Sequence, residues 1–166
     1  FSFSIDTSAP TVTITAIGGT DKIVSTANND NLVTGTAEAN GTVTLKSGST
    51  TLGTTTAAAD GTWSYTLTPA NLSSLGQGSG KAITASQSDA AGNIGSFSFS
   101  FSIDTLGPTI SAIVLTASGA ENGFLNLGDL VKAKVTLSEA VAVSGTPLLK
   151  LQIGTTSVNA TYTPTD

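Results

Sequence analysis

The seven residues Phe-Ser-Phe-Ser-Ile-Asp-Thr occur twice in the sequence, at residues 1–7 and at residues 99–105, so the two copies start 98 residues apart. A proline follows each copy after the same interval, at Pro10 and Pro108. Within each copy, apolar residues alternate with serine, which is typical of a β-strand with one buried and one solvated face. The repeat therefore predicts successive β-units of about 100 residues each.

The positions of the repeat predict where the units begin and end. Residues 1–7 are expected to be the last strand of a preceding repeat or a lead-in, residues 8–104 a complete unit, and residues 105–166 part of a second unit. One helical turn is expected in residues 70–75. Strand-like segments of the complete unit cover residues 11–16, 32–37, 42–46, 50–57, 62–67, 81–88 and 94–103. These seven segments predict an all-β fold of tandem immunoglobulin-like antiparallel β-sandwiches, with about seven strands in each complete unit.

The second unit differs from the first in sequence. Its segment Ser138-Glu139-Ala140-Val141 has no counterpart in the first unit, which indicates a sandwich of another subtype. Its strand-like segments cover residues 109–117, 130–137, 148–153 and 157–162. Because these are too few to close a sandwich core, we expect another part of the protein or a neighbouring chain to complete it.

The composition excludes several classes of function. The chain of 166 residues contains no Cys, His, Met or Arg, and its formal net charge is −5. Without His or Cys, the usual general bases, thiol nucleophiles and zinc ligands are missing, so we do not expect an enzyme. An acidic chain without Arg is a poor candidate for binding nucleic acid. No apolar run approaches the roughly 18 residues of a membrane span.

The acidic residues of the first unit are predicted to lie at the ends of its sandwich and not within its strands. Because alternate loops of an antiparallel sandwich share an end, Asp6, Glu38, Asp60, Asp89 and Asn93 are expected at one end, and Asp21, Asp30 and Asp104 at the other. Oxygen ligands without His or Cys suit Ca²⁺, which would offset the repulsion between like charges. Asp and Asn are also common in turns, so composition alone leaves both interpretations open.

Three motifs in order resemble a known family. They are Ile-Asp-Thr-Ser-Ala-Pro at residues 5–10, Asp-Gly-Thr-Trp-Ser at 60–64 and Asp-Ala-Ala-Gly-Asn at 89–93. This set, which spans residues 1–108, resembles the bacterial immunoglobulin-like repeats of giant secreted adhesins, including biofilm-associated proteins. The resemblance implies a stalk of tandem domains with structural Ca²⁺ between them. By motif position it implies Asp6, Asp89 and Asp104 as ligands, with Asn93 and Asp60 as further candidates; loop position adds Asp21 and Asp30.

The chain departs from these repeats at two places. Gln87 stands where the repeats usually carry an apolar residue, and Gly80-Lys81-Ala82 lacks an aromatic residue often found there. Both departures raise a question about local packing but leave the fold prediction unchanged.

Three hypotheses for the function follow. The first is a structural extender of a large adhesin, located on the bacterial cell surface or secreted, with neighbouring immunoglobulin-like repeats of the same chain as its partners. The second is a subunit of an extracellular filament, sheath or surface layer, in which the strand at residues 1–5 completes the open sheet of another copy. The third is a module that binds a glycan or ice through its threonine rows or Trp63, although the alternation places Trp63 in the core.

Overall fold

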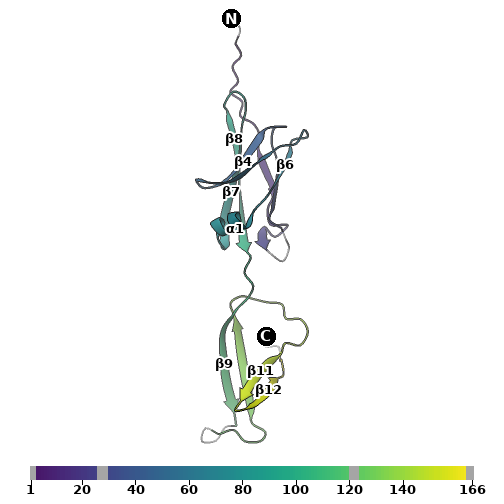
Figure 1. The fold of residues 1–166 in the computed structure, drawn as a ribbon, viewed down its shortest axis with the longest axis vertical. Helices are drawn as coiled ribbons and strands as arrows, with labels where there is room; N and C mark the ends of the chain where they lie inside the picture. The colour runs from purple at the N-terminus through teal and green to yellow at the C-terminus, as the bar shows by residue number, and fades with distance from the viewer. Residues whose placement is uncertain (1–2, 26–29, 120–123, 164–166) are drawn as a thin grey trace. The chain divides into compact units, whose positions relative to one another are not determined.

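The computed structural model describes residues 3–25, 30–119 and 124–163 (Figure 1). The chain divides into two compact units, Phe1–Leu106 and Gly107–Asp166, and each is described by itself. In the described residues, strands provide the regular structure of both units, apart from one short helix in the first. The all-β fold predicted from the alternating sequence is therefore confirmed.

One sheet of the first unit has three antiparallel strands, β1 (Thr13–Ala16), β3 (Leu32–Thr36) and β6 (Thr62–Thr66), in that spatial order. Ile14, Val33 and Trp63 face the core and the threonines lie on the other face, because successive side chains of a strand point to opposite faces. On the outer face, Thr13 Oγ1 lies 2.7 Å from Thr36 Oγ1, and Thr15 Oγ1 lies 3.1 Å from Thr34 Oγ1. Cross-strand hydroxyl pairs thus hold this face together without charged groups.

The other sheet has five strands, in the spatial order β2 (Ile23–Ser25), β8 (Ile94–Asp104), β7 (Gly78–Ser88), β4 (Thr42–Ser47) and β5 (Thr50–Thr56). All neighbours pair antiparallel except β2 and β8, which run parallel. The second copy of the repeated sequence is the last part of β8. There Phe101 pairs with Lys81 of β7, and Ile103 pairs with Val24 of β2.

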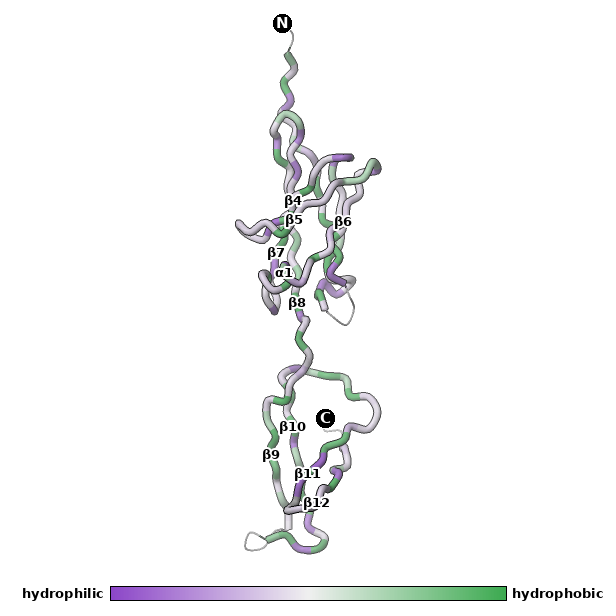
Figure 2. Tube along the Cα trace, viewed as in Figure 1, coloured by the Kyte–Doolittle hydropathy of each residue, from purple (hydrophilic) through white to green (hydrophobic). Residues whose placement is uncertain are grey.

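The two sheets enclose a single apolar core. Figure 2 shows the alternation of apolar and polar residues along its strands. Burying one of the larger apolar side chains contributes on the order of 1.5–3 kcal/mol before the loss of chain entropy. The core consists of Val12, Ile14, Ile17, Val24, Val33, Val43, Leu45, Leu52, Ala57, Trp63, Leu67, Ile83, Ala85, Phe101 and Ile103.

The strand β2 is absent from the sequence-based prediction. It contains only three residues, which is too short for alternation to show. It forms because Lys22 accepts a hydrogen bond from Ser102 N at its carbonyl, 2.9 Å away, and so places the following residues beside β8. The described part of the first unit therefore has eight strands where the sequence predicts seven, and one of its pairings is parallel.

The large apolar side chains of β8 are buried only in the second half of the strand. Ile103 and Phe101 are buried and Phe99 is partly buried, but Phe97 on the same face is 42% exposed. Gly95, on the same face, is buried beside Pro10, so exposure on this face is confined to the stretch around Phe97. The alternation of Phe97, Phe99, Phe101 and Ile103 with serine therefore marks buried side chains only toward the end of the strand.

The predicted helical turn at residues 70–75 is present as α1 (Pro69–Leu75). Thr68 and Asn71 form a capping box: Asn71 N donates to Thr68 Oγ1 at 3.2 Å, and Thr68 N donates to Asn71 Oδ1 at 3.0 Å. Pro69 follows the cap, where a missing N–H costs nothing. In the part of the chain that the structure describes, no helix has the length and apolar character needed to cross a membrane.

Gln87 packs well although it replaces an expected apolar residue. Its side chain is buried, with 3% of its surface exposed. Glu38 N donates to Gln87 Oε1 at 2.9 Å, and Gln87 Nε2 donates to Glu38 O at 3.0 Å. Both polar atoms of the amide are thus satisfied inside the protein. A Cβ at Gly41 would lie 1.9 Å from Gln87 Nε2, so the glycine makes room for the amide.

The second unit consists of two separate two-stranded antiparallel sheets. One pairs β9 (Ile110–Ser118) with β10 (Leu130–Leu137), and the other pairs β11 (Leu149–Ile153) with β12 (Thr156–Ala160). These positions agree with the four segments expected from the sequence.

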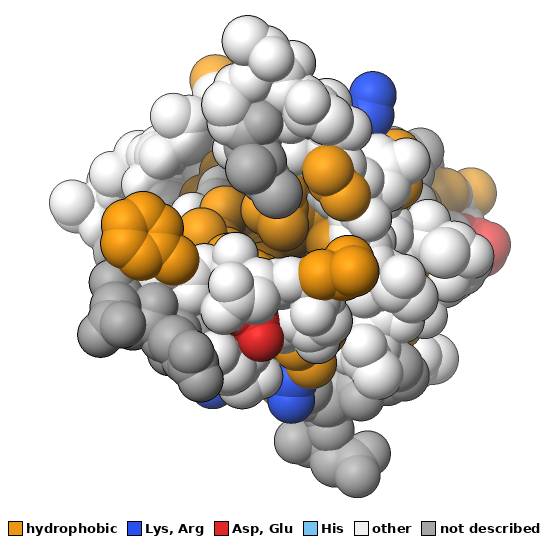
Figure 3. All heavy atoms as spheres, turned by 90° about the horizontal axis from the view of Figure 1, so that it is seen from below, with side chains coloured by type: hydrophobic (Ala, Val, Ile, Leu, Met, Phe, Trp, Pro, Cys, Tyr) orange, Lys and Arg blue, Asp and Glu red, His pale blue; other side chains and the backbone are white. Residues whose placement is uncertain are grey.

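The apolar side chains of the second unit lie open to solvent. The pairing of Leu115 with Ala133 and of Ile113 with Val135 gives the first sheet an apolar face, yet Leu115 is 58% exposed. No side chain is buried among the described residues of this unit. Figure 3 shows apolar side chains exposed around a hollow in the view from below. The four strands therefore form no buried core among the described residues of this unit.

Candidate functional site

Three loops meet at the end of the first unit where residues 3–9 join the sandwich. Ala37 N donates to Gly61 O at 2.9 Å, which links the β3–β4 loop to the β5–β6 loop. The bonds between Gln87 and Glu38 link the first of these to the end of β7. The sequence-based sorting of Glu38, Asp60 and Asp89 to one end agrees with this network.

Asn93 connects the lead-in segment to the β7–β8 loop. Its Nδ2 donates to Asp6 O at 3.1 Å and to Asp89 Oδ2 at 2.8 Å. Asp6 itself accepts a hydrogen bond from Ser8 N on Oδ1, at 3.0 Å. Three of the predicted site residues, Asp6, Asp89 and Asn93, therefore belong to one hydrogen-bonded group, although 87 positions of sequence separate Asp6 from Asn93.

Asp89 organises its own loop. Its Oδ1 accepts hydrogen bonds from Ala91 N and Asn93 N, each at 2.9 Å. The Asn93 side-chain amide, followed by backbone N–H groups of the loop, holds the pKa of Asp89 below its ordinary value of 3.8. Hydrogen bonds to the charged form of a carboxyl favour that form.

Acidification should release this loop only below the ordinary range of an aspartate. Because the folded-state pKa of Asp89 is lowered, its contribution to stability is fully present above pH 3.8 and is lost as the pH falls through the lower folded value. An NMR titration should show a midpoint for Asp89 below 3.8. In Asn93→Ala the midpoint should move upward, and an unchanged midpoint in this variant would contradict the assigned cause.

Asp60 has a local role in the β5–β6 turn. Its Oδ1 accepts hydrogen bonds from Thr62 N at 3.0 Å and from Thr62 Oγ1 at 2.7 Å. The backbone bond from Thr62, followed by the hydroxyl bond, lowers the pKa of Asp60 below 3.8. Within the described residues, no hydrogen bond joins Asp60 to the group formed by Asp6, Asp89 and Asn93, and the conformation of its turn accounts for its contacts.

The remaining predicted ligands lie at the opposite end of the first unit. Asp21 Oδ1 accepts from Ile23 N at 3.0 Å, and Asp30 Oδ1 accepts from Ser25 N at 2.8 Å. Ser25 pairs in register with Asp104, the last residue of β8. Asp30 and Asp104 therefore both adjoin Ser25, where the strand leaves the sandwich.

Gln77 is a further residue of this end, and the sequence-based reasoning did not select it. Thr105 N donates to Gln77 Oε1 at 2.9 Å, and Gln77 Nε2 donates to Thr105 Oγ1 at 2.6 Å. The flanking Gly76 and Gly78 have φ values of 70° and 99°, which favour glycine. The sequence shows a glycine-rich loop here, but the bond to a residue 28 positions away becomes evident only in the structure.

The donors at these two ends match Ca²⁺ in kind but not in number. Ca²⁺ binds six to eight oxygens from carboxylates, amides and carbonyls. Among the described residues, no group of three or more acidic, His or Cys side chains converges as a metal site. At the lead-in end, the carboxylates of Asp6 and Asp89 keep free lone pairs beside the bonds they accept. They can supply part of a coordination shell, and the rest would have to come from outside this group.

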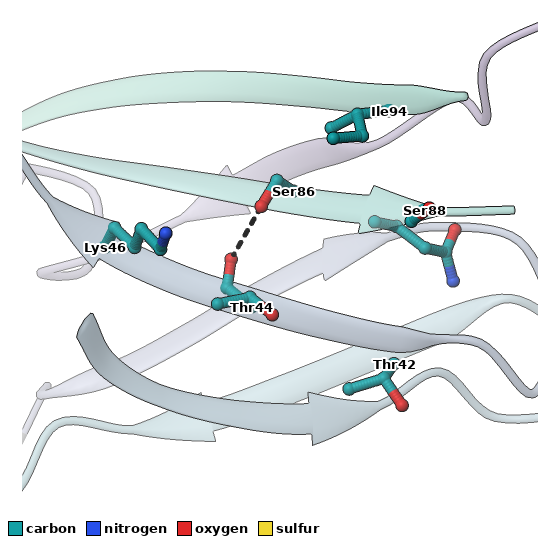
Figure 4. A pocket seen from close by; sticks show the side chains of 7 residues that line it. Thr42, Thr44, Lys46, Ser86, Ser88 and Ile94 are labelled. Carbon is teal, nitrogen blue, oxygen red and sulfur yellow. Dashed lines mark hydrogen bonds between the residues drawn. The ribbon is translucent and has the colours of Figure 1, made fainter. Parts of the chain in front are cut away.

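A shallow hollow lies on the outer face of the five-stranded sheet (Figure 4). Ser86 Oγ donates to Thr44 O at 3.5 Å across the strands that form it. Its lining residues are Thr42, Thr44, Lys46, Ser86, Gln87, Ser88 and Ile94. This set contains no aromatic ring on which a sugar could stack. Trp63 is only 4% exposed, so it belongs to the core, as the alternation predicts.

Comparisons with known proteins bear on the first unit most directly. The chain matches a domain of the ice-binding adhesin of Marinomonas primoryensis with 32% identity, covering 58% of this chain and 98% of that domain, with a TM-score of 0.41. Two longer adhesin structures also match. A 1.5-MDa bacterial ice-binding adhesin is 21% identical with a TM-score of 0.50, and a Ca²⁺-stabilised adhesin of an Antarctic bacterium is 26% identical with a TM-score of 0.45.

The share of each chain that is covered differs between these matches. The present chain is covered to 93% and 92% by the two longer structures, of which it spans 50% and 38%. No curated protein matches significantly. The sequence profile of the bacterial Ig domain matches residues 19–103, which is about half of the chain. The chain therefore belongs to the bacterial Ig domain family.

Proposed function

We propose that the protein is an extender of a large bacterial adhesin, in which sandwich units follow one another in tandem. The observation that carries this proposal is the seven-residue sequence present both in the lead-in and at the end of β8. In this proposal residues 1–7 are the last strand of a preceding repeat, residues 8–104 form one repeat, and residues 105–166 begin another. Membership in the bacterial Ig domain family supports it, as does the similarity to a domain of an ice-binding adhesin.

The architecture of the first unit suits a spacer. The chain joins the sandwich at one end, and β8 leaves it at the other (Figure 1). A unit with its two connections at opposite ends adds length to a tandem array. The extender would act outside the cell, on the bacterial surface or on a secreted protein, and would support adhesion or biofilm formation.

We further propose that Ca²⁺ stiffens the junctions between units. Asp6, Asp89 and Asn93 would supply oxygens where a unit begins, and Asp104, with Asp30 and Asp21 nearby, where it ends. The neighbouring unit would supply the remaining ligands. A divalent cation there would neutralise carboxylates that otherwise repel one another across a short linker, and so would restrict bending. Asp60, which is engaged in its own turn, would stay outside this shell.

Removing Ca²⁺ should therefore change the dimensions of the chain but not its β-sheet content. In small-angle X-ray scattering, we expect the maximum dimension to decrease and the ensemble to broaden when a chelator is added. Asp104→Ala should reproduce this change in the presence of Ca²⁺, with an unchanged circular dichroism spectrum. Glu38→Gln, which removes a carboxylate from the other end of the unit, is the matched control. Identical profiles with and without chelator would overturn the calcium proposal.

A second candidate function rests on the apolar surfaces left open. Phe3 and Ile5 are 86% and 80% exposed, and the second unit exposes Leu115 in one sheet and Val158 in the other. A strand of one copy that completes an open sheet of another would build a filament or surface layer by strand addition. Electron microscopy of the purified chain separates the two functions, because only this one produces long ordered fibres.

A further inference from the structure

The repeated dipeptide Asp-Thr is held by side-chain amides in both of its copies, but on different atoms. In the first copy, Asp6 O accepts a hydrogen bond from Asn93 Nδ2 at 3.1 Å. In the second copy, Thr105 N donates to Gln77 Oε1 at 2.9 Å, and Gln77 Nε2 donates to Thr105 Oγ1 at 2.6 Å. Both amides belong to the first unit; Asn93 bonds the dipeptide where that unit begins, and Gln77 bonds the dipeptide where it ends.

The two contacts involve the two polar groups of the peptide bond between Asp and Thr, the carbonyl in the first copy and the N–H in the second. In the repeat, Asp6 corresponds to Asp104 and Thr7 corresponds to Thr105. The carbonyl of the Asp is therefore bonded by the following unit, and the N–H of the Thr by the preceding unit. The described residues contain no cis peptide bond, and in a trans peptide the C=O and N–H point in opposite directions. Both contacts can consequently form at one junction without competing.

We infer that Gln77 and Asn93 are the positioning residues of a junction between two units of the first kind, and that together they hold the connecting peptide from both sides. This inference rests on the tandem arrangement proposed above. A peptide group is planar, so fixing both of its ends fixes the direction in which the chain passes from one unit to the next. The partner of each unit is thus another unit of the same kind. The contact requires no cation, because neutral amides make it.

The test uses the 166-residue chain with residues 8–105 duplicated, so that one junction joins two copies of the first unit. The protein contains no Cys, so Ser96→Cys in each copy places two spin labels at an exposed site. Double electron–electron resonance then measures the distribution of distances between the copies. We expect Gln77→Ala in the first copy, or Asn93→Ala in the second, to widen this distribution about twofold, because rotations about φ and ψ at the junction are freed.

Three controls separate positioning from folding and from cation binding. Gln77→Glu, which keeps an acceptor for Thr105 N, should retain the narrow distribution. Gln152→Ala, which removes an amide that donates to Gly154 O within its own hairpin, should change nothing. The thermal midpoint of the first unit should not move in Gln77→Ala. Asn93→Ala also loses the bond to Asp89, so its distances are measured well below its own thermal midpoint. All measurements are made in Ca²⁺ and in chelator.

The outcomes distinguish this inference from the calcium proposal. Widening in both junction variants, in chelator as well as in Ca²⁺, supports the amide contacts. An unaltered width in both variants overturns them. If the chelator alone widens the parent distribution to the level of the variants, the amide contacts are overturned and the cation holds the junction. If the variants widen the distribution but chelation does not, the calcium proposal fails while this inference stands.

Discussion

Replacing Gly35 with alanine is expected to destabilise the first unit by about 3 kcal/mol or more. A Cβ at this position in β3 would lie 2.0 Å from Thr13 O and 2.4 Å from Trp63 Cζ2. The carbonyl belongs to the neighbouring strand β1 and the ring is buried in the core, so neither can move without loss of pairing or packing. Urea unfolding followed by the fluorescence of Trp63, the single tryptophan, measures the loss.

Gly107→Ala is the matched control for this substitution. A Cβ at Gly107 would meet no atom within 4 Å, so the same added methyl group should leave the midpoint of unfolding in place. A Gly35→Ala protein as stable as the parent would show that Thr13 O and the Trp63 ring do not lie as close to Gly35 as described here.

Replacing Gln87 with alanine is expected to cost about 1–3 kcal/mol, because Glu38 N loses its partner and Glu38 O keeps only the bond from Gly41 N. Gln87→Leu introduces the apolar residue that the resemblance implies at this position, but it leaves Glu38 N without its partner and Glu38 O with only the bond from Gly41 N. We therefore expect both variants to be destabilised, which a packing defect alone would not produce. Unfolding in urea with the same tryptophan signal provides the measurement.

Gln77→Ala is the control for the Gln87 variants. Gln77 is exposed, and among the described residues its side chain bonds to Thr105, just after β8, so the same loss of an amide should not change the midpoint of unfolding. A Gln87→Leu protein more stable than the parent would contradict this prediction. It would show that burying the amide destabilises the core by more than its bonds to Glu38 stabilise the β3–β4 loop.

Much of the fold could be predicted because strand alternation is a local property. The threonine rows of β1 and β3 and the phenylalanines of β8 mark which side of each strand is buried. Alternation does not predict burial where burial depends on residues distant in the sequence. Phe97 has the same alternation as Phe101, yet it is 42% exposed, whereas Phe101 is buried. In the same way, β2 is defined by its pairing with β8 and not by its own three residues.

The candidate site was predictable in its residue types but not in its contacts. Carboxylates at the ends of a sandwich follow from loop order, and the structure brings Asp6, Asp89 and Asn93 together. The sequence could not show that the amide of Asn93 bonds both Asp6 and Asp89, nor that Gln77 holds Thr105. Such contacts depend on the φ values of loop residues and on pairings across the whole unit, which no short motif records.

The hydroxyl pairs on the sheet faces have a consequence for the conditions in which such a protein can work. Thr13 with Thr36, and Thr84 with Ser98 at 2.7 Å, join neutral groups, so dissolved ions do not screen them as they screen charge pairs. The body of the first unit should therefore keep its stability from dilute buffer to brine. Its acidic residues lie at its ends, where ions can act. Salt would then adjust how successive units are joined without altering the units themselves.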